Sequence, residues 1–358
     1  MIVPSPRLAP ARFRPHATRA LLAALVALVA SLPAQERGDR LLVCNRSDDT
    51  LSIFDPRTGR ELATLKTGPT PAEVAVSPDG RTAVVSNARS GGGAQTADLT
   101  VVDVVAARVR GEVRLTDRRL RAPSLRGVAF APDGRALAVA GADGRAVAGS
   151  PLEGAWRTSW STGQSAPQLV AITADGRQAA TTCPRDGTVS FFALAPSTPR
   201  TPRAAPRITR TGRGAEGIAL HPVTGDAWVA NRDDDLLSVV SAASGEVLHT
   251  FDTGRAPLRV AFTPRGDRVL VTCIRGGELM IFDAAARALL GEVSVHGDRS
   301  EQSSLPRGVV SDPEGERAYV TCARGEFVAV IDLRRAEVVA RIDARRGPAG
   351  LAFARPRR

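Results

Sequence analysis

Residues 305–347 read LPRGVVSDPEGERAYVTCARGEFVAVIDLRRAEVVARIDARRG. Apolar and polar residues alternate along this segment and β-branched residues are frequent, which is the pattern of β-strands. The alternation predicts four strands, at 308–311, 318–322, 327–332 and 337–342. Pro313 and Gly315 lie in the first turn, where proline fixes φ and glycine can adopt a positive φ. The segment therefore predicts a meander of four antiparallel strands.

The beginning of this segment recurs along the chain as an apolar alternation that is followed, in most copies, by a turn resembling Pro-Asp-Gly. The copies begin at Val74, Val128, Val170, Ile218, Val260, Val309 and Leu351. Their first residues are 54, 42, 48, 42, 49 and 42 positions apart. A unit of about 42 residues has the length of one four-stranded propeller blade. Such a unit can bury both faces only against neighbouring units.

The two ends of the repeat region indicate how many blades there are. The region begins with three strands, at 41–44, 51–55 and 61–65, and ends with a single first strand at 350–353. Pairing these ends completes a seventh blade and removes an exposed sheet edge. We therefore predict an all-β fold, a seven-bladed β-propeller of four-stranded antiparallel blades over 39–354, followed by a basic tail at 355–358. The alternative is an open solenoid.

The N-terminal segment has the features of a secretory signal peptide. Residues 1–19 contain four arginines and no acidic residue, and an apolar run follows at 20–32. This run is too short to span a bilayer and leads to a cleavage site after Ala34. We predict a signal peptide at 1–34 and a periplasmic or secreted mature protein with no membrane span. The alternative is a hydrophobic N-terminus that is retained.

The composition excludes a disordered or collagen-like chain, because 43% of the residues are apolar. The formal net charge of +11 arises from 48 basic and 37 acidic residues. Almost all the basic residues are arginine, and a bias of this kind can follow from genome base composition. The charge is therefore weaker evidence for an anionic partner than its size suggests.

The repeats resemble a known family. Tyr319-Val-Thr, Val330-Ile-Asp and the repeated Pro-Asp-Gly phrase are similar to those of the YVTN-repeat, YncE-like seven-bladed propellers. The resemblance extends over essentially the whole chain after the signal peptide, and it implies the fold more strongly than a function. For YncE-like members it implies DNA binding. Single-stranded nucleic acid needs aromatic stacking platforms, and only Phe327 borders the relevant loops, so we do not expect a nucleic-acid partner.

A propeller of this kind places the residues before each innermost strand around the mouth of its central channel. The residues two positions before each repeat landmark are Ala72, Arg126, Gln168, Glu216, Leu258, Arg307 and Ala349. Glu216 is the only carboxylate expected at the mouth. Arg126, Gln168, Glu216 and Arg307 are the candidate ligand-binding residues in this set. The alternative is that these charged groups pair with one another.

A second set of residues follows the second strand of each blade on the same face. An arginine stands one or two residues past that strand in six blades, at Arg46, Arg89, Arg185, Arg232, Arg275 and Arg324. Guanidinium groups bind carboxylates and phosphates in a bidentate manner, so these arginines predict an anion-attracting rim. The alternative is a solvated surface of mixed charge, because acidic residues lie on the same loops.

The cysteines and histidines suggest no cofactor. Cys44, Cys183, Cys273 and Cys322 occupy nearly equivalent positions in different blades, and neighbouring sheets lie too far apart for most disulfides. We expect four buried free thiols. A Cys273–Cys322 or Cys322–Cys44 bridge is the alternative. No spacing predicts haem attachment or a zinc site.

We therefore expect a monomeric, non-catalytic propeller scaffold, without a cofactor, that binds a protein or a small anionic ligand near the channel. One alternative is a hydrolase resembling the seven-bladed lactonases, with Arg126, Glu216 and Arg307 at the channel mouth. A nucleic-acid-binding YncE-like protein is a second alternative, and an electron-transfer propeller related to haem d1 enzymes is a third. An unpaired Glu216 would favour the hydrolase.

Overall fold

The computed structural model describes residues 38–88, 99–113, 125–140, 144–150, 155–194, 204–296 and 304–357. Side chains are not described at 136–140 and 155–158. The predicted signal peptide and Arg89 lie outside the described residues. Residues 39–358 form one compact unit.

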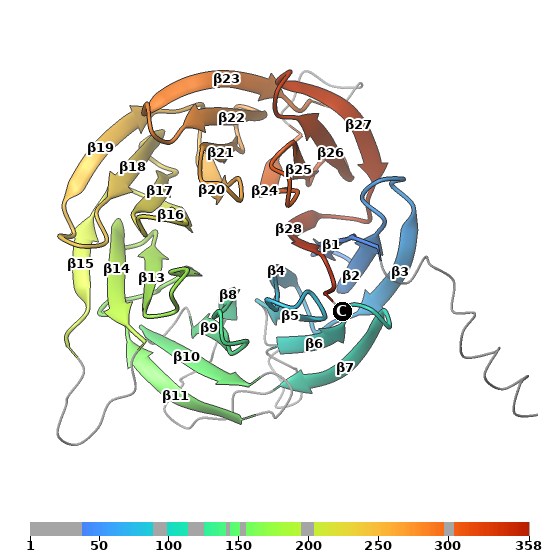
Figure 1. The fold of residues 1–358 in the computed structure, drawn as a ribbon, viewed down its shortest axis with the longest axis horizontal. Helices are drawn as coiled ribbons and strands as arrows, with labels where there is room; N and C mark the ends of the chain where they lie inside the picture. The colour runs from blue at the N-terminus through green and yellow to red at the C-terminus, as the bar shows by residue number, and fades with distance from the viewer. Residues whose placement is uncertain are drawn as a thin grey trace, which may run out of the picture. The chain divides into compact units, whose positions relative to one another are not determined.

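This unit is an all-β propeller of four-stranded antiparallel blades arranged around a central axis (Figure 1). From the innermost to the outermost strand, the blade that joins the two chain ends contains β28 (Pro348–Ala354), β1 (Arg40–Asn45), β2 (Thr50–Phe54) and β3 (Glu61–Lys66). The next blade contains β4 (Pro71–Val76), β5 (Thr82–Asn87), β6 (Leu99–Asp103) and β7 (Arg108–Val113). It is followed by β8 (Leu125–Phe130), β9 (Ala136–Ala140), β10 (Arg145–Ser150) and β11 (Ala155–Ser161).

The remaining sheets have the same order. They are β12 (Leu169–Ile172), β13 (Gln178–Cys183), β14 (Thr188–Ala193) and β15 (Arg207–Arg210), then β16 (Ala215–Leu220), β17 (Ala227–Asn231), β18 (Leu236–Val240) and β19 (Val247–Asp252). The last two are β20 (Pro257–Phe262), β21 (Arg268–Cys273), β22 (Glu278–Asp283) and β23 (Ala288–Ser294), and β24 (Pro306–Ser311), β25 (Arg317–Cys322), β26 (Phe327–Asp332) and β27 (Glu337–Asp343). The prediction of a propeller with four-stranded antiparallel blades is confirmed.

The C-terminal strand pairs with the first strand of the chain. β28 runs antiparallel to β1, with Arg40 opposite Ala354 and Val43 opposite Leu351. Beyond β28, the Arg355 guanidinium binds both carboxylate oxygens of Asp39, at 2.8 and 2.6 Å, and also contacts Glu314. The segment expected as a basic tail is thus tied to the propeller at its first residue.

The turn between the first two strands of a blade shows why the Pro-Asp-Gly phrase recurs. Between β4 and β5 the Gly80 amide donates to the carbonyl oxygen of Ser77 at 2.8 Å, and Gly80 has a φ of +72°. The Asp79 carboxylate accepts a hydrogen bond from the Arg81 amide at 2.9 Å. Glycine is favoured here because other residues rarely adopt a positive φ.

Apolar side chains pack between adjacent blades and form the core. One cluster joins the first and last blades through Leu41, Tyr319, Val328 and Leu351, all less than 10% exposed. All four cysteines are buried free thiols, as predicted. Burial raises the pKa of Cys322 to about 12, which keeps this thiol protonated at neutral pH.

Glu61 on β3 makes stability depend on pH. Burial would raise its pKa, but hydrogen bonds from Thr64, Arg345 and Ser52 outweigh burial and lower it. A lowered folded-state pKa stabilises the protein above the ordinary pKa of glutamic acid, and this contribution is lost as pH falls through the folded value. We expect the free energy of unfolding in urea to fall less steeply below pH 5 in Glu61→Gln than in the parent. Parallel pH profiles for the two proteins would contradict this.

Candidate ligand site at the channel mouth

The innermost strands approach one another closely because four of the seven sheets have glycine at one equivalent position of the innermost strand. This position, one residue before each repeat landmark, holds Gly350, Glu73, Gly127, Leu169, Gly217, Arg259 and Gly308 in blade order. A Cβ added at Gly217 would lie 2.5 Å from the carbonyl oxygen of Leu258 in the next blade. At Gly350 it would lie 2.5 Å from that of Ala72. At this position only the side chains of Glu73, Leu169 and Arg259 extend into the central channel.

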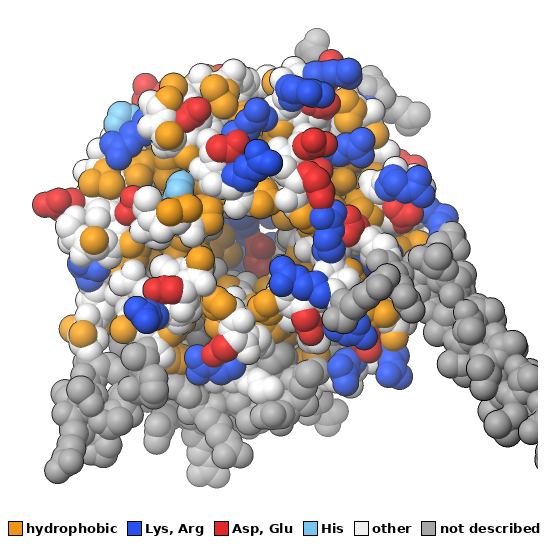
Figure 2. Space-filling model, in the orientation of Figure 1, with side chains coloured by type: hydrophobic (Ala, Val, Ile, Leu, Met, Phe, Trp, Pro, Cys, Tyr) orange, Lys and Arg blue, Asp and Glu red, His pale blue; other side chains and the backbone are white. Residues whose placement is uncertain are grey.

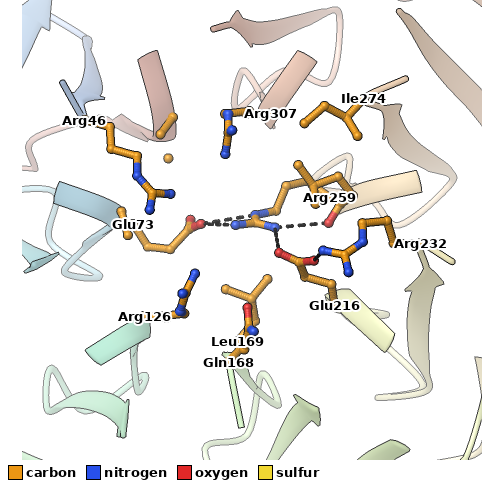
Figure 3. Close-up of a pocket in the computed structure, with 14 residues that line it drawn as sticks. Arg46, Glu73, Arg126, Gln168, Leu169, Glu216, Arg232, Arg259, Ile274 and Arg307 are labelled. Atoms are coloured by element: carbon orange, nitrogen blue, oxygen red, sulfur yellow. Dashed lines mark hydrogen bonds and ion pairs between the residues drawn. The ribbon is translucent and has the colours of Figure 1, made fainter. Parts of the chain in front are cut away.

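Two of these side chains form an ion pair across the channel (Figure 3). The Arg259 guanidinium on β20 binds Glu73 Oε1 on β4, with N–O distances of 2.5 and 3.1 Å. Its other terminal nitrogen lies 3.8 Å from Glu216. Burial would lower the pKa of Arg259, but the charges of Glu73 and Glu216 outweigh burial and raise it. We call Glu73, Leu169 and Arg259 the channel plug.

The plug separates two spaces within the channel. Its three residues line a cavity of about 250 Å³ at the mouth and a second space of about 130 Å³ on the other side. Apolar residues, including Val128, Ile218 and Val309, surround the second space. Because the same three residues line both spaces, the plug is the floor of the mouth cavity. Figure 2 shows one face of the protein, in the orientation of Figure 1, which is hollowed at its centre and carries intermixed acidic and basic side chains.

The mouth cavity contains the whole first set of predicted residues. Its lining includes Ala72, Arg126, Gln168, Glu216, Leu258, Arg307 and Ala349. Glu216 is 9% exposed and is paired with Arg232, whose guanidinium nitrogen lies 2.6 Å from Glu216 Oε2. The expectation that Glu216 is the only carboxylate at the mouth is wrong, because Glu73 also lines it.

Three arginines of the cavity make no such pair. Arg46, Arg126 and Arg307 come from three different blades and point into the same space (Figure 3). Within the described part of the chain, no hydrogen bond or ion pair engages their guanidinium groups. Burial and the neighbouring charges of Arg126 and Arg259 lower the pKa of Arg46, and burial with Arg46 and Arg259 lowers that of Arg307. The cavity thus holds mutually repelling cations.

The arginines of the second set form two groups, which differ in how many residues separate them from the end of the second strand. Arg46 and Arg232 directly follow β1 and β17 and line the cavity. Their backbone amides donate to the carbonyl oxygens of Gly347 and Gly214, each at 3.0 Å, which attaches each loop to the segment before the innermost strand. Arg185, Arg275 and Arg324 stand one residue further along, are exposed and do not line the cavity.

Sequence reasoning missed Glu73 and Arg259. The signal that could have revealed them is the alternation of glycine with larger residues at their position, which marks the side chains that face the axis. Gln168, which was predicted, lines the cavity beside Leu169 (Figure 3).

The described residues contain no group of three or more histidine, cysteine or acidic side chains placed to hold a metal ion. Among the same residues there is no helix with the length and apolar character needed to cross a membrane.

Comparisons with known proteins show the fold alone. No protein-family model matches the sequence, and a search of curated proteins gives no match. A crystal structure of a functionally unknown protein from Desulfotomaculum acetoxidans is similar, with a TM-score of 0.71 and 16% identity over 88% of this chain and 99% of that one. Hydrazine synthase from Kuenenia stuttgartiensis is also similar, with a TM-score of 0.65 and 17% identity over 83% of this chain and 93% of that chain.

Proposed function

We propose that this protein is a non-catalytic propeller that binds a small anionic ligand at the mouth of its central channel. The observation that carries the proposal is the convergence of three unpaired guanidinium groups, those of Arg46, Arg126 and Arg307, in one cavity. Burying like charges without partners is costly, and an anion in the cavity would offset that cost. Guanidinium groups also match the geometry of carboxylates and phosphates.

A binding role fits the carboxylates better than catalysis does. Glu216 is held by Arg232 and Glu73 by Arg259, so both are engaged in ion pairs. A general base must be free to accept a proton from the substrate. The paired state of Glu216 therefore favours binding over a lactonase-like reaction.

We further propose that the seven sheets form one closed ring related to the YVTN-repeat, YncE-like propellers. The pairing of β28 with β1 and the repeated turn phrase support this relation. The arginine-rich N-terminus and the apolar run up to Ala34 support export to the periplasm or the medium. We expect the exported protein to be a monomer.

Alanine variants of the unpaired arginines test the binding site. In isothermal titration with sulfate, phosphate and small carboxylates at constant ionic strength, we expect the parent to bind at least one anion. Arg126→Ala and Arg307→Ala should each weaken that binding about tenfold to a hundredfold, because a hydrogen bond to a charged group contributes about 1.5 to 3 kcal/mol.

Arg275→Ala is the matched control, since Arg275 is exposed on the same face and does not line the cavity. It should bind the same anions as the parent does. Anion binding that persists unchanged in both Arg126→Ala and Arg307→Ala would refute the proposal.

A further inference from the structure

The charges in the mouth cavity do not balance. Its lining includes five arginines and two glutamates. The two glutamates are paired with Arg232 and Arg259. Three positive charges, those of Arg46, Arg126 and Arg307, are left without a counter-charge among the lining residues. A ligand that paired with each of these three arginines would carry three anionic groups.

The three arginines reach the cavity from three different blades. Arg126 and Arg307 are the second residues of the innermost strands β8 and β24, whereas Arg46 follows β1 in a third blade (Figure 3). Guanidinium groups that enter a cavity from three separate blades suit a ligand whose anionic groups stand on separate arms.

Apolar side chains share the lining of the cavity with the charged ones. Leu169 lies in the floor, and Leu258 and Ile274 contribute to the walls, together with Ala72 and Ala349. Such surfaces favour an aliphatic frame, because apolar area on both partners is removed from water. The volume of about 250 Å³ lies below the usual range for drug-sized ligands, so the frame must be short.

From these observations we propose that the mouth cavity binds an organic anion with three anionic groups, such as carboxylates, on a short aliphatic frame. This inference rests on the proposed anion-binding function and adds the charge and the form of the ligand. Arg46, Arg126 and Arg307 each bind one anionic group, and Leu169 contacts the frame. The ion pair between Glu73 and Arg259 closes the cavity beneath it.

A series of carboxylates with similar frames tests the number of charges. Isothermal titration at pH 7.5 and constant ionic strength compares butyrate, glutarate and tricarballylate, which carry one, two and three carboxylates. We expect the dissociation constant to fall about tenfold or more with each added carboxylate. In Arg126→Gln, tricarballylate should bind about as weakly as glutarate binds to the parent. Arg275→Gln is the control, and its dissociation constants for the three compounds should equal those of the parent.

The possible outcomes separate this inference from the proposed function. Equal affinity for all three compounds would overturn the three-charge site but leave anion binding at the mouth intact. Pyrophosphate binding more tightly than tricarballylate would overturn the aliphatic frame. If the protein binds none of these anions and binds neither sulfate nor phosphate, the proposed function itself fails.

Discussion

Deletion of residues 348–358 is expected to abolish cooperative folding. The deletion removes β28, the innermost strand of its blade, and exposes the edge of β1. It also removes Leu351 from the cluster that joins the first and last blades, and Arg355 from its contacts with Asp39 and Glu314. The total free energy of unfolding of a single domain is only about 5 to 15 kcal/mol. The loss of a whole internal strand should therefore cost more free energy than the folded state can lose. Urea unfolding followed by circular dichroism measures the effect.

A circular permutant provides the matched control. In the native register the end of β28 at Ala354 lies opposite the start of β1 at Arg40. A chain that begins at residue 348 and continues through a short turn into Asp39 would therefore form the same blade as a direct hairpin. We expect this permutant to unfold cooperatively, in contrast to the deletion. Normal folding of the deletion variant would show that the β28–β1 pairing does not close the ring.

Breaking the ion pair across the channel should have the next largest effect on stability. The side chains of Arg259 and Glu73 are 21% and 18% exposed, so both charges are largely removed from water. In Arg259→Leu the Glu73 carboxylate remains largely removed from water but has lost the guanidinium group that paired with it. We expect a loss of about 3 kcal/mol in the free energy of unfolding, because one-sided removal of a buried pair leaves an uncompensated charge. Urea denaturation of the purified variant measures it.

The double variant Glu73→Leu with Arg259→Leu separates the cost of a lone charge from the loss of packing. It should recover most of the lost stability, since an apolar pair of similar volume can replace a buried ion pair. Arg213→Gln is the control for a surface pair, because Arg213 is 74% exposed beside Asp234, and it should leave stability unchanged. A double variant as unstable as Arg259→Leu would contradict the assignment of the cost to the lone carboxylate.

The channel plug also affects the net charge of the mouth cavity. Arg259 lies between Glu73 and Glu216 and supplies the cation that offsets both carboxylates in the floor of the cavity. Without it, the net positive charge of the mouth would fall. We therefore expect the plug to contribute both to the stability of the propeller and to the anion binding proposed for the cavity.

Much of the propeller could be predicted from the sequence because its signals are local. The period of two and the turn residues depend on neighbours in the chain, and the strand predicted at 327–332 is observed as Phe327–Asp332. The return of the chain end to β1 could also be predicted, since an incomplete first blade and a lone last strand complete each other. The positions of Arg126, Gln168, Glu216 and Arg307 at the mouth followed from the repeat register.

The pairing of charges could not be predicted in this way. Glu73 and Arg259 are 186 positions apart, and their contact exists only because the propeller places β4 and β20 on either side of one axis. Whether an arginine following the second strand faces the channel depends on a shift of a single residue, as the difference between Arg232 and Arg275 shows. Local patterning thus determined the strands and their repeat. The tertiary structure alone decided which charges neutralise one another, because ion pairing depends on distance in space and not along the chain.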